Sequence, residues 1–221
     1  MKLYPLSQAS RTATNINNIS RRLGIDVLTF EPVTLNGIVI LADGTPDDCA
    51  IAVIAYHLNG KKSVGVVKPE EKRYDVFRYL PVYLKYKVDK IAVLIDQENE
   101  GLASVFNKIE KKVSETGIVI QNAAKERRLK VYRCRHGVKE FQLISIVNGL
   151  DEHPFERHTI EDHLLKVAEK LPEVKISSND PKKVWNELKD RQYEVYKKLK
   201  ETKDIEDVFP QQVKGLKCLC E

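Results

Sequence analysis

The stretch from Gly37 to Asp48, GIVILADGTPDD, constrains the fold of this chain more than any other. Its apolar, β-branched part ends at Asp43, and a run of this length bounded by glycine predicts a buried strand. The next residues, Cys49 to Leu58, are apolar and rich in alanine, which predicts a mostly buried helix. We expect Asp47 or Asp48 to cap that helix, because acceptors satisfy its free backbone N–H groups. Ligands bind at such strand-to-helix junctions in open α/β sheets.

A second stretch, Lys90 to Glu98, predicts another buried strand that ends in acidic residues, Asp96 and Glu98. Their side chains lie on one side if the extended conformation continues, because strand side chains alternate. In one parallel sheet, both would converge with Asp43. Two like charges about 4 Å apart repel by roughly 4 kcal/mol at an effective dielectric near 20. A hard cation that prefers oxygen ligands, Mg²⁺ or Mn²⁺, is therefore the expected partner.

This pattern, a strand, acid-Gly-x-x-Asp, a helix and a later strand ending in Asp-x-acid, resembles the toprim domain. That domain occurs in topoisomerases, bacterial-type primases and the overcoming-lysogenization-defect nucleases, and the likeness is closest to small stand-alone archaeal toprim-like proteins. It covers about Gly37 to Glu115, with a weaker echo at 157–162. The resemblance implies an α/β fold with a mostly parallel sheet covered by helices on both faces. Asp43 stands where the family usually has Glu, and Glu98 where it usually has Asp, so charge is kept but reach changes.

The leading hypothesis is Mg²⁺-dependent phosphoryl transfer on nucleic acid, DNA or RNA, by a nuclease. We expect Asp43, Asp96 and Glu98 to hold the cation, helped by Asp47 or Asp48, with Asp43 and Asp96 as the catalytic pair. No tyrosine stands in an assignable nucleophile position, which disfavours a strand-passing topoisomerase, and no template-handling module supports a primase. A non-catalytic nucleic-acid or protein-interaction module on the same scaffold stays open as the alternative, because Asp43 is shorter than the family's Glu.

A polar segment before a third acidic stretch predicts a helix from Ile160 to Leu171 with Thr159 as its N-cap. Glu161 and Asp162 then fall in its first turn, where carboxylates complement the helix dipole. The resemblance to toprim nucleases offers a second interpretation, in which one of them is a ligand for a second metal ion. His158 suits phosphate contact or proton transfer better than Mg²⁺ binding. Both interpretations of the two acids stay open.

The basic residues point weakly to a polyanionic partner. The formal charge is +5, from 37 Lys and Arg against 32 Asp and Glu, which fits such a partner without requiring one. In the stretch Val131 to His136, Arg133 and Arg135 occupy alternate positions of a predicted strand and would contact phosphates. The alternative is a solvated edge strand that its charges protect against aggregation.

The remaining pattern sets the order of elements. Lys62–Val67 predicts a middle strand, Leu102–Val113 an amphipathic helix and Phe141–Leu150 another buried strand. The aromatic and basic residues of Pro69–Tyr86 predict core packing, with base stacking as the alternative. Alternating strands and helices predict a parallel sheet covered by helices.

The chain of 221 residues is expected to form a toprim-like α/β domain, residues 1–176, and a helical C-terminal extension, residues 177–221. A helix over Gln8–Leu23 should dock on the domain, and the charged helix Lys182–Glu201 predicts packing or protein contact instead of a site. No run approaches the roughly 20 apolar residues of a membrane span, so we expect a cytoplasmic protein without a membrane partner. Assembly into a homo-oligomer is left open.

Overall fold

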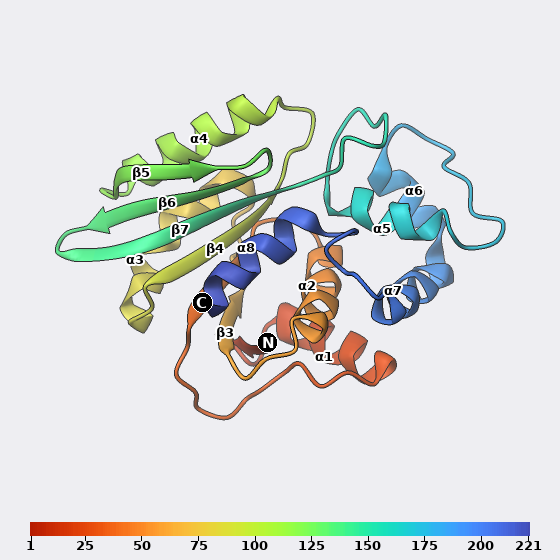
Figure 1. Ribbon diagram of the computed structural model, residues 1–221, viewed down its shortest axis with the longest axis horizontal. Coiled ribbons are helices and arrows are strands. Elements are labelled where there is room, and N and C mark those ends of the chain that lie inside the picture. The colour runs from red at the N-terminus through yellow and green to blue at the C-terminus, as the bar shows by residue number, and fades with distance from the viewer.

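The strands predicted from the acidic stretches are neighbours in one sheet (Figure 1), in a computed structural model that describes residues 1–221. The sheet has seven strands in the order β1-β3-β2-β4-β7-β6-β5. It is parallel from β1 to β7 and antiparallel from β7 to β5. In chain order the strands are β1 (Lys2–Pro5), β2 (Gly37–Leu41), β3 (Ser63–Val67), β4 (Lys90–Asp96), β5 (Val119–Lys125), β6 (Leu129–His136) and β7 (Lys139–Asn148).

Helices cover both faces of this sheet (Figure 1). They are α1 (Arg11–Leu23), α2 (Thr45–His57), α3 (Leu80–Tyr83), α4 (Leu102–Glu115), α5 (Ile160–Ala168), α6 (Pro181–Glu187), α7 (Gln192–Glu201) and α8 (Pro210–Cys220), with 3-10 turns at Arg73–Tyr79, Leu84–Tyr86 and Lys189–Arg191. The first 3-10 turn, α3 and α4 pack on one face, and the remaining helices on the other. The chain is therefore an α/β protein with a mostly parallel sheet and a helical C-terminal segment, as the sequence predicts.

The apolar strands are buried on both faces. In β4, Ile91, Val93 and Ile95 belong to the core cluster under α4, while Ala92 and Leu94 belong to the cluster under α2 and α8. Side chains alternate along a strand, so a strand covered on both faces appears in sequence as a continuous apolar run.

The predicted cap of α2 is wrong, and the structure excludes the edge-strand alternative for β6. The N-cap of α2 is Gly44, which has no side chain to cap it, and Asp47 and Asp48 lie inside the first turn. The helix begins at Thr45, two residues before Asp47 and three before Asp48, and of the two acids Asp47 contacts the sheet edge, through Asn148. β6 is not an edge strand, because β5 pairs with it on its outer side.

The C-terminal segment is packed into the same core as the rest of the chain. The single helix expected over Lys182–Glu201 is divided into α6, a 3-10 turn and α7. α8 lies against β7, β4 and β2, and its Gly215 faces Ile146 of β7. The division into residues 1–176 and 177–221 stays a prediction. No helix of the chain combines the length and the apolar character needed to cross a bilayer.

The close approach of α8 to β7 is testable with Gly215→Val. A Cβ at this position would lie 2.5 Å from Cδ1 and 2.7 Å from Cγ1 of Ile146. Overpacking of this kind costs about 1–3 kcal/mol, so we expect a lower free energy of unfolding in urea. Lys214→Val places the same side chain at an exposed neighbouring position and should change stability by about 0.5 kcal/mol or less. Equal stability of the two variants would contradict tight docking of α8.

Candidate functional site

The carboxyl ends of β2 and β4 bring two acidic residues into direct contact. The backbone N–H of Asp96, the last residue of β4, donates a hydrogen bond to Asp43 Oδ2 at 2.7 Å. The backbone N–H of Ile160, the first residue of α5, donates to Asp96 Oδ1 at 3.1 Å. Asp43 and Asp96 therefore share one edge of the sheet, and the start of α5 lies against the same edge.

A single amide joins Asp96 to the start of α2. Asn148 is the last residue of β7 and lies beside Asp96 in the parallel register of β4 and β7. Its Nδ2 donates to Asp96 Oδ1 and to Asp47 Oδ1, both at 3.1 Å. Carboxylates from β4 and α2 are thereby held by one neutral donor group.

Three carboxylate oxygens in this cluster are buried without a hydrogen-bond donor: Asp47 Oδ2, Asp96 Oδ2 and Glu161 Oε2. The exposed fractions of these residues are 1 % for Asp47, 1 % for Asp96 and 5 % for Glu161. A buried charged group without a partner costs far more free energy than a hydrogen-bonded one. Oxygen ligands of this kind are what a hard divalent cation prefers.

The pKa values of the clustered carboxyls rise together. Burial, followed by repulsion from Asp96, raises the pKa of Asp43 to about 7 and that of Asp47 well above its ordinary value. The same two causes raise the pKa of Glu161 to about 7, and burial raises that of Asp96. Near neutral pH the cluster therefore retains protons unless a cation compensates its charge.

A lysine from the C-terminal segment supplies part of that compensation. Lys182 Nζ lies 2.6 Å from Glu98 Oε1 and 3.4 Å from Asp96 Oδ2. Burial opposes a charged Lys182, but the nearby Asp96 and Glu98 outweigh it and raise the pKa of the lysine. The segment that the sequence assigns to packing thus reaches into the acidic cluster.

Glu98 is paired with two cations. Its backbone has a left-handed φ of 58°, and its N–H and C=O pair with the backbone of His158. Its carboxylate faces Lys182 and, at 3.6 Å, Arg157 Nε. The extended conformation assumed in the sequence therefore ends at Asp96, and the Asp-x-acid alternation does not continue to Glu98.

Asp48 is held apart from the cluster by other partners. Its Oδ2 accepts a hydrogen bond from Asn15 Nδ2 of α1 at 2.7 Å, and its Oδ1 pairs with Lys68 Nζ at 2.8 Å. Of the two neighbouring acids in α2, only Asp47 has a buried oxygen, Oδ2, with neither a hydrogen bond nor an ion pair.

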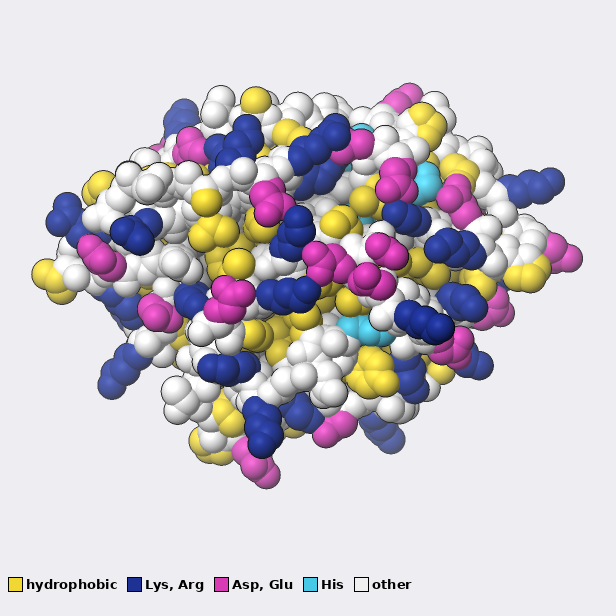
Figure 2. All heavy atoms as spheres, in the orientation of Figure 1, with side chains coloured by type: hydrophobic (Ala, Val, Ile, Leu, Met, Phe, Trp, Pro, Cys, Tyr) yellow, Lys and Arg dark blue, Asp and Glu magenta, His cyan; other side chains and the backbone are white.

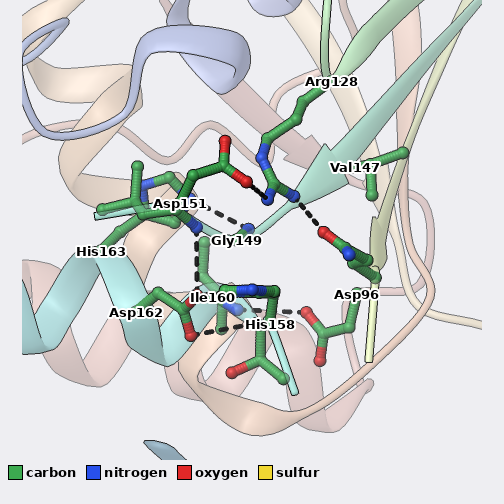
Figure 3. Close-up of polar contacts among 12 residues, drawn as sticks. Asp96, Arg128, Val147, Gly149, Asp151, His158, Ile160, Asp162 and His163 are labelled. Carbon is green, nitrogen blue, oxygen red and sulfur yellow. Dashed lines mark hydrogen bonds and ion pairs between the residues drawn. The ribbon is translucent and has the colours of Figure 1, made fainter. Parts of the chain in front are cut away.

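Asp162 is engaged at the start of α5 (Figure 3). Its Oδ1 accepts from the backbone N–H of Thr159 at 3.1 Å, and its Oδ2 accepts from the backbone N–H of Leu150 at 3.0 Å. His158 Nδ1 lies 2.8 Å from the same Oδ2. Asp162 therefore acts as a helix-start carboxylate, whereas its neighbour Glu161 joins the cluster. His158 is tied to Asp162 and is only partly exposed.

Arg133 and Arg135 lie far from the carboxylates. Both are exposed on β6, opposite Gln142 and Glu140 of β7. Gln142 and Glu140 precede Asn148 by six and eight positions in β7, so a rise of about 3.3 Å per residue puts them, and the arginines opposite them, about 20 and 26 Å from Asn148. On the face drawn in Figure 2, Lys and Arg side chains are interspersed with Asp and Glu. Nothing there forms one wide positive field.

Asn148 is supported from beneath by α8. Gln212 Nε2 donates to Asn148 Oδ1 at 2.9 Å and to His163 Nε2 at 3.0 Å. His163 Nδ1 donates to the carbonyl of Val208 at 2.6 Å, and burial lowers the pKa of His163 to about 3. The imidazole is thus a neutral buried acceptor. Sequence reasoning missed this network because its members are distant in the chain and follow no motif.

The carboxylates of the cluster suit Mg²⁺, which needs few protein ligands, better than a metal ion that needs a complete set of protein ligands already in place. No group of three or more His, Cys, Asp or Glu side chains is already arranged to hold a metal ion. Mg²⁺ keeps several of its waters and is bound through one or two carboxylates plus substrate phosphates. One or two of the buried oxygens of Asp47, Asp96 and Glu161 that accept no hydrogen bond would supply such ligands.

Comparison with protein-family models, with curated proteins and with solved structures finds no significant match to this chain. The resemblance to toprim domains therefore stays a prediction.

The raised pKa of Glu161 predicts a pH-dependent effect of Glu161→Gln in the metal-free protein. Between pH 4.5, the ordinary pKa of a glutamate, and about pH 7, the raised pKa of Glu161, the native protein keeps a proton on Glu161 that the unfolded chain has released. Its contribution to stability is thus complete below pH 4.5 and lost as the pH rises through 7. Glutamine does not titrate, so the variant should gain stability relative to the wild type across this range, measured by urea unfolding.

His163 contributes the opposite trend: because its pKa is lowered, it removes stability as the pH falls below 6.5, the ordinary pKa of histidine. His163 is present in both proteins, so its contribution cancels when the free energy of unfolding of the wild type is subtracted from that of the variant. Glu152→Gln, at an exposed position, is the matched control and should show a constant difference. A flat difference for Glu161→Gln as well would contradict the burial of this carboxylate in the cluster.

Proposed function

We propose that this chain is a divalent-metal-dependent phosphoryl-transfer protein that acts on nucleic acid, a nuclease on a toprim-like scaffold. The observation that carries the proposal is the set of buried oxygens of Asp47, Asp96 and Glu161 that accept no hydrogen bond. Of these, Asp96 Oδ2 has an ammonium beside it, Lys182 Nζ at 3.4 Å. They lie at the carboxyl ends of parallel strands, where open α/β sheets bind ligands. The adjacency of β2 and β4, with Asp43 two residues after β2 and Asp96 at the end of β4, supports the toprim resemblance.

Asp96, Asp47 and Glu161 would hold the cation. Bound Mg²⁺ or Mn²⁺ supplies polarisation of a backbone phosphate and stabilises charge on the leaving oxygen. Asp43 is the proton acceptor: its Oδ2 already accepts from the N–H of Asp96, so Oδ1 is free to take a proton from the attacking hydroxyl or water. Its pKa of about 7 suits a general base at neutral pH. Lys182 places a positive charge beside the site and reduces the repulsion that a phosphate would meet.

Asp96→Asn tests this assignment. The substitution removes the central carboxylate but keeps its shape, so metal-dependent cleavage should fall by at least about a hundredfold, the scale of losing one charge-stabilising group. The measurement is cleavage of single- and double-stranded DNA and RNA with Mg²⁺ or Mn²⁺, and with EDTA as a blank. Glu152→Gln, an exposed carboxylate, should leave cleavage unchanged. Metal-dependent cleavage that survives Asp96→Asn would place the activity elsewhere.

A specific observation favours a second candidate, a non-catalytic nucleic-acid or protein-interaction module. The ammonium of Lys182 already lies against Asp96 and Glu98 and partly neutralises the cluster without any metal. On this interpretation the acids and the lysine only join the C-terminal segment to the sheet. The wild-type protein would then cleave no substrate with either metal, and Asp96→Ala would bind nucleic acid undiminished.

Lys182→Met separates the two candidates without an activity assay. If the cluster is a cation site, loss of the competing ammonium should strengthen Mg²⁺ binding, seen as a rise in melting temperature at lower Mg²⁺ concentration than in the wild type. Lys183→Met changes the exposed neighbouring lysine and should behave like the wild type. If Mg²⁺ raises the melting temperature of none of the three proteins, the cation site is contradicted and the interaction module remains.

A further inference from the structure

A polar cleft of about 310 Å³ opens beside Asp43, and no hydrophobic residue lines it. Four cationic side chains from three segments line it: Arg11 at the start of α1, Lys68 and Lys72 in the loop after β3, and Lys182 at the start of α6. The cleft and the acidic cluster meet at Asp43 and Lys182. An anion in the cleft would therefore lie next to the proposed cation site.

Two of these cations have no partner in the protein. Lys68 pairs with Asp48, which also lines the cleft, and donates to the carbonyl of Gly44. Lys182 pairs with the acidic cluster. Arg11 and Lys72 form no ion pair or side-chain hydrogen bond, and both are exposed. Their charge is therefore available to a ligand.

The backbone adds to the positive character of the cleft. Arg11 begins α1, and Gly44 is the N-cap of α2; each helix has 13 residues, so each directs the positive end of its dipole here. Gly44 is exposed and provides no side chain to cap α2. Two carboxylates, Asp43 and Asp48, also line the cleft. Lys68 pairs with Asp48 and Lys182 lies beside the cluster that contains Asp43, so Arg11 and Lys72 are the two cations left without a paired acid.

We propose that this cleft binds the sugar-phosphate backbone of one nucleic-acid strand, through Arg11 and Lys72, next to the phosphate that faces the carboxylates. The inference rests on the proposed function and names how its substrate is held. Sequence-independent binding of single strands normally combines cations with aromatic stacking platforms. Because this cleft has no aromatic or apolar lining, it contacts phosphates and not bases. Binding should therefore be indifferent to base sequence and steeply dependent on salt.

The test is equilibrium binding of a fluorescein-labelled single-stranded DNA of about 12 nucleotides, measured in EDTA so that no cleavage occurs. For Arg11→Ala/Lys72→Ala, affinity should fall at least about tenfold, since two charge-assisted contacts are lost. The slope of log affinity against log salt should fall by about 1.4, or about 0.7 for each phosphate contact. Lys85→Ala/Lys111→Ala, two exposed cations outside the cleft, should change neither value.

The exposed arginines of β6 are the rival surface. If Arg133→Ala/Arg135→Ala weakens binding and Arg11→Ala/Lys72→Ala does not, the sheet face holds the strand and the cleft proposal is overturned. Equal effects of the cleft and control variants, or no binding by the wild type, also overturn it. Oligo-dT and oligo-dA should bind alike; a strong preference would mean that bases are read, contrary to the proposal.

This experiment fails separately from the proposed function. Binding that depends on Arg11 and Lys72, with no cleavage when Mg²⁺ or Mn²⁺ is added, would preserve the cleft and remove the nuclease. Metal-dependent cleavage with an unchanged KM in Arg11→Ala/Lys72→Ala would preserve the nuclease and remove the cleft. Circular dichroism melting of each variant checks the fold, and because both side chains are exposed and unpaired, no change is expected.

Discussion

Mutual repulsion of carboxylates at one edge of the sheet is the constraint on which the rest of this structure depends. Two apolar strands, buried on both faces, end side by side, and this places Asp43 and Asp96 in contact with each other. The backbone N–H groups of Asp96 and Ile160 and the amide of Asn148 are neutral donors to the cluster, and they satisfy only some of its oxygens. The remaining negative charge must be compensated by something else.

Three kinds of compensation compete for that charge. Protons bind because burial and proximity raise the pKa values of Asp43 and Glu161 to about 7. The ammonium of Lys182 binds from the side of the C-terminal segment. Under the proposed function a divalent cation displaces protons and weakens the hold of the lysine. Stability, pH and metal binding are then linked through one cluster, because each compensating group binds the native state better than the unfolded chain.

The sequence was informative where a local rule governs the result. The apolar runs of β2 and β4 have one stable arrangement, and their acidic ends meet as a consequence. Thr159 precedes a helix that starts where the capping pattern predicts. The sequence was uninformative where an irregular backbone conformation or a contact between distant residues decides the position of a side chain. Alternation predicted the side on which Glu98 lies, but a left-handed residue ends the strand geometry. Lys182 belongs to a charged helix with no site motif, and only the folded chain brings it to Asp96.

The same reasoning explains why the cleft and the cluster belong together. A phosphodiester brought to a group of carboxylates is repelled unless fixed cations stand on its other side. At a separation of about 6 Å and an effective dielectric near 20, each such charge pair changes the energy by about 3 kcal/mol. Arg11 and Lys72 are exposed and the carboxylates are buried, and Lys182 both lines the cleft and pairs with Asp96. An opening lined by both cations and carboxylates favours a ligand that carries both charges, a phosphate with a cation bound to it.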